Sequence, residues 1–311
     1  MSILDNTKFT LLVCEMFYQR GLSQKQIAQE LVISRSQVCR ILAAALEKRL
    51  VTITLHYPNP DESFYQKKIN EKYGIGEVYI YDTGELRGIE EMNYLAEVSK
   101  NLFPVIVKDN DKVGVMAGRT LSALAKALSK SRNRGLQFVP LCGGTGSNGS
   151  DWYANAVAEN FSEKTNGRYY ILNAPQYCSN IEGKNMLIKE PSIKEILELG
   201  KTCNSVLIGI GNIESDSTTI EASNLLKSDI NTLKSLGAIA SICSSYLDKD
   251  GKIIDCDVAD RIVGLSIEEL KNTKKIGIAQ GKSKIEAIKS VLKGGYLDVI
   301  ITTLSTAKLL I

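Results

Sequence analysis

Four short segments of the chain combine glycine with hydroxyl-bearing, amide or basic residues. These segments are Gly118–Thr120, Gly143–Ser147, Gly211–Asn212 and Gln280–Lys284. Glycine lets the backbone turn tightly against a ligand, hydroxyl groups donate hydrogen bonds, and the start of a following helix carries partial positive charge. This chemistry suits a phosphate group. None of the segments is a Walker A or G-x-G-x-x-G motif, so a nucleotide is not favoured.

Each segment follows a predicted strand. Strands are predicted at Glu77–Tyr81, Lys112–Met116, Gln137–Leu141, Tyr169–Leu172, Ser205–Ile210, Lys275–Ala279 and Asp298–Ile301. Helices are predicted between them, at Glu90–Leu102, Leu121–Leu128, Trp152–Lys164, Ile193–Leu199, Ile285–Leu292 and Ser305–Leu310. This alternation predicts an α/β domain with a doubly wound, mostly parallel sheet.

Ligands of such sheets bind beyond the carboxyl ends of the strands. The candidate effector-binding residues are therefore Gly118, Arg119, Thr120, Gly143, Gly144, Thr145, Ser147, Gly211, Lys282 and Lys284. Turns between strands and helices are often rich in glycine and hydroxyl residues without binding anything. That explanation is the better one for Gly211–Asn212 taken alone, but four such segments beside three basic residues favour an anion site.

The first part of the chain has the pattern of a helix-turn-helix. Ser23 with Gln26, and Ser34 with Gln37, form two S-x-x-Q capping boxes eleven residues apart, so each predicts the start of a short helix. A preceding helix is predicted at Leu4–Arg20 and a short strand or wing at Val51–Leu55. The candidate DNA-binding residues lie at the start of the second helix and are Ser34, Arg35, Ser36, Gln37 and Arg40.

The charge distribution supports this interpretation. Residues 1–55 contain seven Lys or Arg and four Asp or Glu, which gives 7 − 4 = +3, and the whole chain is also +3. The net positive charge therefore resides in the segment that would meet DNA phosphates. A generic three-helix dimerisation module is the alternative for this segment.

Proline-rich sequence separates the two parts. The segment HYPNPDES contains Pro58 and Pro60, so we expect a helix-turn-helix domain at 1–56, a linker at 57–61 and an effector domain at 62–311, which would open with a helix at Glu62–Tyr73.

The remaining composition excludes several classes of protein. No apolar run is long enough to cross a bilayer and no basic-then-apolar leader is present, so a cytoplasmic location without membrane contact is expected. The seven cysteines form no C-x-x-C pair, and His56 is the single histidine. We therefore expect no metal site, no disulfide framework and no cofactor.

The chain resembles the SorC family of bacterial sugar-responsive transcriptional regulators along nearly its whole length. The resemblance lies in residues 18–42, VGVMAGRTL (113–121), VPLCGGTGS (139–147), LIGIGNIES (207–215), LGAIASICSSYLDKDG (236–251) and residues 278–310. It implies a winged helix-turn-helix, an effector domain similar to sugar-phosphate isomerases and deaminases, and assembly as a homodimer or homotetramer. It also implies operator DNA and a phosphorylated sugar or polyol as partners.

By position, the resemblance implies that Gly118–Thr120 form a phosphate loop, Gly143–Thr145 a second loop, and Lys284 a lysine at the start of a helix. Ser241 and Leu304 stand where the family often has carboxylates. Two groups that would hold sugar hydroxyls are thus missing.

Two functions are consistent with these features of the sequence. The first is a DNA-binding regulator of carbohydrate metabolism, a repressor or activator, whose operator affinity depends on a phosphorylated sugar. The alternative is an isomerase-like or deaminase-like enzyme with an appended DNA-binding domain. Such an enzyme needs a carboxylate base. The predicted loops contain no acidic residue, and Asp151 and Glu214 lie beyond them, so we expect no catalysis.

Overall fold

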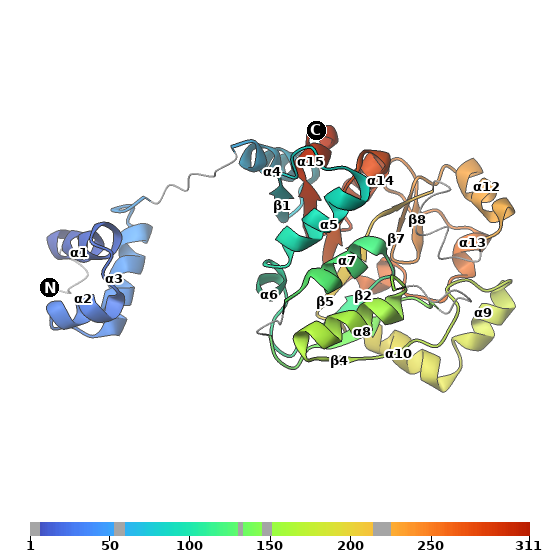
Figure 1. Ribbon diagram of the computed structural model, residues 1–311, viewed down its shortest axis with the longest axis horizontal. Coiled ribbons are helices and arrows are strands. Elements are labelled where there is room, and N and C mark those ends of the chain that lie inside the picture. The colour runs from blue at the N-terminus through green and yellow to red at the C-terminus, as the bar shows by residue number, and fades with distance from the viewer. Residues whose placement is uncertain (1–6, 53–59, 130–132, 145–150, 214–224) are drawn as a thin grey trace. The chain divides into compact units, whose positions relative to one another are not determined.

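The computed structural model describes residues 7–52, 60–129, 133–144, 151–213 and 225–311 of the chain. The chain divides into two compact units, Met1–Pro58 and Asn59–Ile311 (Figure 1). Each unit has a hydrophobic core of its own.

The first unit is helical. It contains α1 (Thr7–Cys14), a π-helical turn η2 (Glu15–Gln19), α2 (Gln24–Glu30) and α3 (Arg35–Glu47). Its core includes Val13, Met16, Ile27, Val38 and Ile41, each at most 2% exposed. The predicted helix at 4–20 is thus α-helical only to Cys14, and residues 4–6 lie outside the described part. In the predicted strand at 51–55, Val51 and Thr52 are not in a strand, and residues 53–55 are not described.

The second unit begins with a helix. Helix α4 spans Pro60–Tyr73, so the expected linker at 57–61 is too long by two residues. Pro60 is tolerated there because the N–H group that proline lacks would have no partner in the first turn of a helix.

A seven-stranded parallel sheet forms the centre of this unit. Its order is β1-β10-β9-β5-β2-β3-β4, and every neighbouring pair is parallel. The strands are β1 (Glu77–Tyr81), β2 (Lys112–Val115), β3 (Gln137–Pro140), β4 (Arg168–Tyr169), β5 (Ser205–Gly209), β9 (Lys274–Ile278) and β10 (Val299–Thr303). Each predicted strand thus corresponds to one strand of the sheet, with bounds shifted by a few residues.

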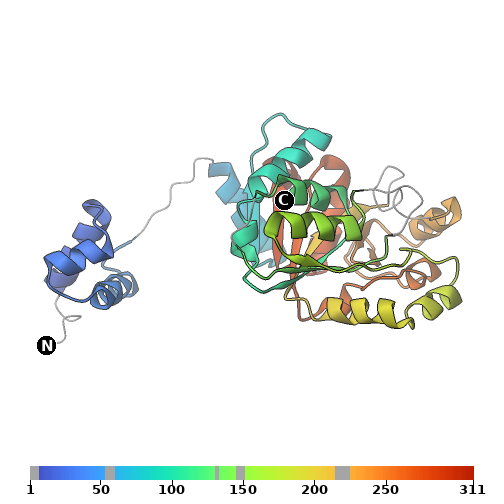
Figure 2. The same cartoon turned by 60° about the horizontal axis from the view of Figure 1, so that its bottom comes forward.

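Helices cover both faces of the sheet. From β1 to β4 the chain crosses in one direction through α5 (Gly88–Ser99), α7 (Arg119–Ala127) and α8 (Ala154–Thr165). It returns through α10 (Pro191–Lys201) and α14 (Ile285–Lys293) and ends in α15 (Leu304–Leu310). Right-handed crossovers in opposite directions place their helices on opposite faces. Accordingly, α8 and α10 flank the β3–β4 end of the sheet (Figure 2).

The direction of the connections reverses between two neighbouring strands. The chain leaves β2 toward β3, whereas it leaves β5 toward β9, and β2 and β5 are paired. Such a reversal opens a crevice at the carboxyl ends of the two strands. The segments at Gly118 and Gly211 begin there.

A small antiparallel sheet was not expected from the sequence. It consists of β6 (Gly211–Asn212), β7 (Ala240–Ile242) and β8 (Ser245–Leu247), in the order β6-β7-β8. Gly211–Asn212 is therefore an edge strand and not an ordinary loop. Cys243 and Ser244 connect β7 to β8 with φ values of 43° and 49°, a left-handed conformation that is costly for residues with a side chain.

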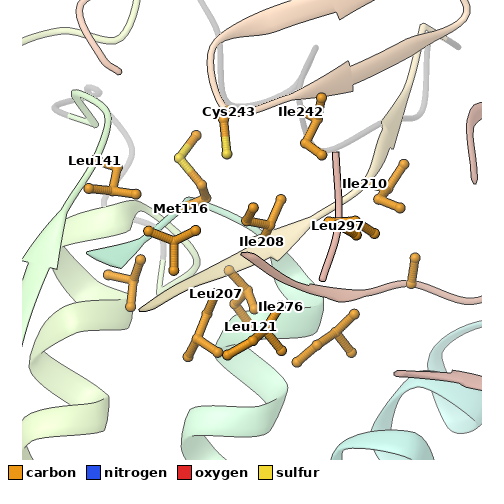
Figure 3. Packing of buried hydrophobic residues seen from close by; sticks show 14 of the residues in the cluster. Met116, Leu121, Leu141, Leu207, Ile208, Ile210, Ile242, Cys243, Ile276 and Leu297 are labelled. Atoms are coloured by element: carbon orange, nitrogen blue, oxygen red, sulfur yellow. The ribbon is translucent and has the colours of Figure 1, made fainter. Parts of the chain in front are cut away.

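The core of the second unit lies between the sheet and its helices. Leu207 and Ile276 from neighbouring strands pack with Leu121 of α7 in this core (Figure 3). Several shorter helices complete the unit. They are α6 (Phe103–Ile106), α9 (Ile181–Leu187), α12 (Lys227–Ser235), α13 (Asp257–Asp260) and the 3₁₀ turns η3 (Glu268–Leu270) and η4 (Lys282–Lys284).

Candidate functional sites

The polar surface of the first unit is built by the two capping boxes. Ser23 accepts a hydrogen bond from the Gln26 N–H, Ser34 accepts one from the Gln37 N–H, and both glutamines reach back to the serine backbone. The inward face of α3 is buried at Val38, Ile41, Leu42 and Ala45. The candidate residues Ser34, Arg35, Ser36 and Arg40 are exposed, and Gln37 is half-buried.

The side chain of Gln37 already takes part in the cap of α3. The Ser34 N–H donates to Gln37 Oε1 at 2.8 Å, so this oxygen already serves the cap. Arg40 bends back, with Nε 3.4 Å from the Ser36 carbonyl oxygen. At this surface, the amide nitrogen of Gln37 and the side chain of Arg35 are the groups best placed to contact a partner.

The second unit contains a cavity of about 470 Å³ at the carboxyl ends of the strands. Six of the predicted effector residues line it, namely Gly118, Arg119, Thr120, Gly211, Lys282 and Lys284. They come from the ends of β2, β5 and β9. Since neighbouring strands lie about 4.8 Å apart, the β2 and β9 segments are roughly 10 Å from each other across the sheet.

The remaining predicted residues are not placed at this cavity. Gly143 and Gly144 are absent from its described lining, and Thr145 and Ser147 lie outside the described residues. The Gly143 N–H donates to the Val263 carbonyl and the Gly144 N–H to the Ala174 carbonyl, so neither is available to an anion. A side chain at Gly143 would approach the Pro175 carbonyl oxygen to 2.3 Å. Close backbone packing therefore accounts for Gly143.

Hydrogen bonds hold the cavity loops together. Asn212 Nδ2 donates to the Ser283 carbonyl at 3.1 Å and joins β6 to η4. Gly281 has φ +104° and donates its N–H to Thr306 Oγ1 at 3.0 Å. Gln280 Nε2 donates to the Gly88 carbonyl at the start of α5. The loop that carries Lys282 and Lys284 is thus fixed from three sides.

The charge of the cavity lining is predominantly positive. Within the described lining, the charged residues are one carboxylate, Glu91, and four basic residues, Arg87, Arg119, Lys282 and Lys284. The first turns of α7 and of the η4–α14 segment also border the cavity and add partial positive charge. An anionic ligand is the species that such a lining favours.

A second part of the lining forms a neutral wall. It is formed by Gln176, Tyr177 and residues of the small sheet from Ser241 to Tyr246. Burial raises the pKa of Cys243, Tyr177 and Tyr246, so these groups carry no charge at neutral pH. Tyr177 and Tyr246 share a hydrogen bond of 2.6 Å between their hydroxyl groups.

Sequence reasoning missed Glu91, Arg87 and this neutral wall. The predicted loops contain no acidic residue, but Glu91 of α5 lines the same cavity from outside those loops. In the sequence, its position in the first turn of an amphipathic helix does not distinguish it from a surface glutamate. The small sheet supplied no signal because its strands have only two or three residues.

Within the described residues, no group of three or more His, Cys, Asp or Glu side chains could hold a metal ion. In the same residues, no helix is long and apolar enough to cross a membrane.

Comparison with known proteins assigns the family. Residues 59–311 match the family described as "Putative sugar-binding domain". The chain belongs to this family. It is 29% identical to the deoxyribonucleoside regulator of Bacillus subtilis, over 99% of this chain and 98% of that protein. It is 23% identical to the sorbitol operon regulator of Klebsiella pneumoniae, over 99% of this chain and 98% of that protein.

Solved structures show the same fold. The full-length sorbitol operon regulator SorC matches with a TM-score of 0.74 and 22% identity, over 98% of this chain and 99% of that one. A DeoR family transcriptional regulator from Listeria monocytogenes matches with a TM-score of 0.74 and 27% identity, over 80% of this chain and 99% of that one. The expected SorC-type membership is confirmed, and the named relatives are transcriptional regulators.

Proposed function

We propose that the chain is a DNA-binding transcriptional regulator of carbohydrate metabolism whose operator affinity depends on a phosphorylated sugar or polyol. The observation that supports it most is the cavity of about 470 Å³ with four basic side chains and two helix starts in its lining. A phosphate group matches this charge, and the neutral wall suits the carbon skeleton of a small sugar.

The first unit would bind the operator as a helix-turn-helix, with the start of α3 in the major groove. The net charge of +3 over residues 1–55 supports contact with phosphates. A homodimer or homotetramer would bind repeated or palindromic half-sites about one helical turn or a multiple of it apart.

The alternative is an isomerase-like or deaminase-like enzyme. Glu91 gives the cavity the carboxylate that such chemistry needs. However, Glu91 accepts hydrogen bonds from Thr303 and Ser305 of the protein itself, and the named relatives are regulators. The regulator is the better supported function.

A thermal-unfolding screen tests the effector class. Pairs of sugar phosphates and the corresponding free sugars are added to the full-length protein. A ligand that binds only the native state stabilises it by about 2.7 kcal/mol at a hundredfold excess over Kd. We expect phosphorylated members alone to raise the unfolding temperature of the second unit.

Two variants control this screen. Lys284→Ala should abolish the shift, whereas Lys289→Ala, in α14 but outside the cavity lining, should retain it. Equal shifts with free sugars and their phosphates would contradict the phosphate assignment.

A further inference from the structure

Glu91 is a buried carboxylate in the wall of the cavity. Glu91 is 2% exposed and lines the cavity from α5. Within the described residues, no lysine or arginine forms an ion pair with it. Burying a charge without a neighbouring cation costs free energy, so packing alone does not explain a glutamate at this position.

A hydroxyl network holds one of its two oxygens. Ser305 Oγ donates to Glu91 Oε1 at 2.6 Å and Thr303 Oγ1 donates at 2.8 Å, while Thr83 Oγ1 lies 3.5 Å from the same atom. Thr303 and Ser305 belong to the β10–α15 junction, and Thr83 follows β1. Three separate hydroxyl groups thus fix the position of the carboxylate.

The second carboxylate oxygen, Oε2, is not held in this way. All hydrogen bonds of Glu91 to the described residues end on Oε1. Oε2 is not one of the fully buried side-chain atoms without a partner in the described structure, so the protein does not enclose it completely. Since Glu91 lines the cavity, Oε2 is the carboxylate oxygen that remains to accept hydrogen bonds from a ligand there.

We propose that Glu91 determines effector specificity by accepting hydrogen bonds from hydroxyl groups on the carbon skeleton of a phosphorylated sugar or polyol. This inference rests on the proposed function. A cationic ligand group would also suit a carboxylate, but Arg87, Arg119, Lys282 and Lys284 in the same lining would repel it. A ligand with a phosphate at one end and hydroxyl groups at the other satisfies both kinds of residue.

The sheet topology separates Glu91 from the segment Gly118–Thr120. Glu91 contacts the β10–α15 junction, whereas Gly118–Thr120 follow β2, three strand positions away in the order β10-β9-β5-β2. At about 4.8 Å per strand, Glu91 is roughly 14 Å from that segment and roughly 5 Å from Lys282–Lys284 after β9, so a phosphate held between the two segments leaves a gap of roughly 10 Å to Glu91. Methyl phosphate is too short to span it, and an extended five- or six-carbon ester is closer to the required length.

Calorimetric titration of the full-length protein tests this assignment. The probes are methyl phosphate, ribose 5-phosphate and sorbitol 6-phosphate. Wild-type protein should bind at least one hydroxylated ester tenfold or more tightly than methyl phosphate. Glu91→Gln keeps an oxygen for the Thr303 and Ser305 hydroxyls but replaces the other acceptor with a donor. It should remove that preference, while methyl phosphate binds equally or more tightly because a negative charge is gone.

Two further variants separate binding from folding. Glu90→Gln makes the same substitution at the adjacent, exposed position of α5 and should keep the wild-type preference. Ser305→Ala removes the 2.6 Å hydrogen bond that orients Glu91 and should lose part of the preference, which keeps the test valid if Glu91→Gln does not fold.

The outcomes distinguish the two proposals. If no ester binds wild-type protein, the proposed function fails. If esters bind but wild-type protein shows no preference for hydroxyl groups, or if Glu91→Gln and Ser305→Ala keep the preference, only the assignment of Glu91 is overturned.

Discussion

Gln37 shows how one side chain can serve both folding and recognition. Its Oε1 completes the capping box of α3, which leaves its amide nitrogen for a base edge. An alanine at this position would therefore change helix stability and DNA contact together. A glutamate separates the two effects, since S-x-x-E is an equally good capping box and a carboxylate is favourable at a helix start.

For Gln37→Glu we predict an unchanged or slightly higher unfolding temperature and a loss of operator affinity of about tenfold or more. The donor is lost and a negative charge faces the DNA. Gel-shift titration measures the affinity, and Gln29→Glu on the exposed side of α2 is the control with the same charge change. Unchanged binding by Gln37→Glu would remove α3 from the predicted interface.

At the scale of elements, the strands of the large parallel sheet were predictable and those of the small antiparallel sheet were not. Ser205–Gly209 and Val299–Thr303 are buried, β-branched runs followed by glycine or helix-start residues, so their sequence predicts them. The strands β6, β7 and β8 are too short for any periodicity, although they form the neutral wall of the cavity.

The attachment of α12 to this wall is also invisible in the sequence. Arg261 is 7% exposed and forms ion pairs with Asp229 of α12 at 2.7 Å and with Asp257 at 3.0 Å. It also donates to the Cys178 carbonyl at 3.2 Å. Burial alone would lower the pKa of Arg261, but the hydrogen bonds to the two aspartates raise it overall.

We predict that Asp229→Ala lowers the free energy of unfolding by about 3–5 kcal/mol, because it leaves a buried arginine without its closest partner. Asp257→Ala should cost less than about 1 kcal/mol, since that side chain is 76% exposed. Urea denaturation of both variants measures the difference. Equal effects would show that the Asp229 contact does not anchor α12.

At the scale of the whole molecule, the sequence indicates where a ligand binds but not which distant residues meet there. Loops after β2, β5 and β9 were predictable because parallel strands end at one edge. Contacts such as Glu91 with Thr303 and Asn212 with Ser283 join segments 212 and 71 residues apart, and no local pattern encodes them. For the same reason, the sequence suggested a ligand role for Gly143 that its backbone packing explains better.

The central claim is that a ligand in the second unit changes DNA binding by the first. Fluorescence anisotropy of a labelled operator, with and without the phosphate ester that most stabilises the protein, tests it directly. Allosteric coupling is typically 1–3 kcal/mol, so a saturating ester should change the operator Kd of wild-type protein by about fivefold or more. Lys284→Ala should bind the operator normally and not respond to the ester at the same concentration. An ester that saturates the second unit of wild-type protein but leaves its operator Kd unchanged would contradict the account.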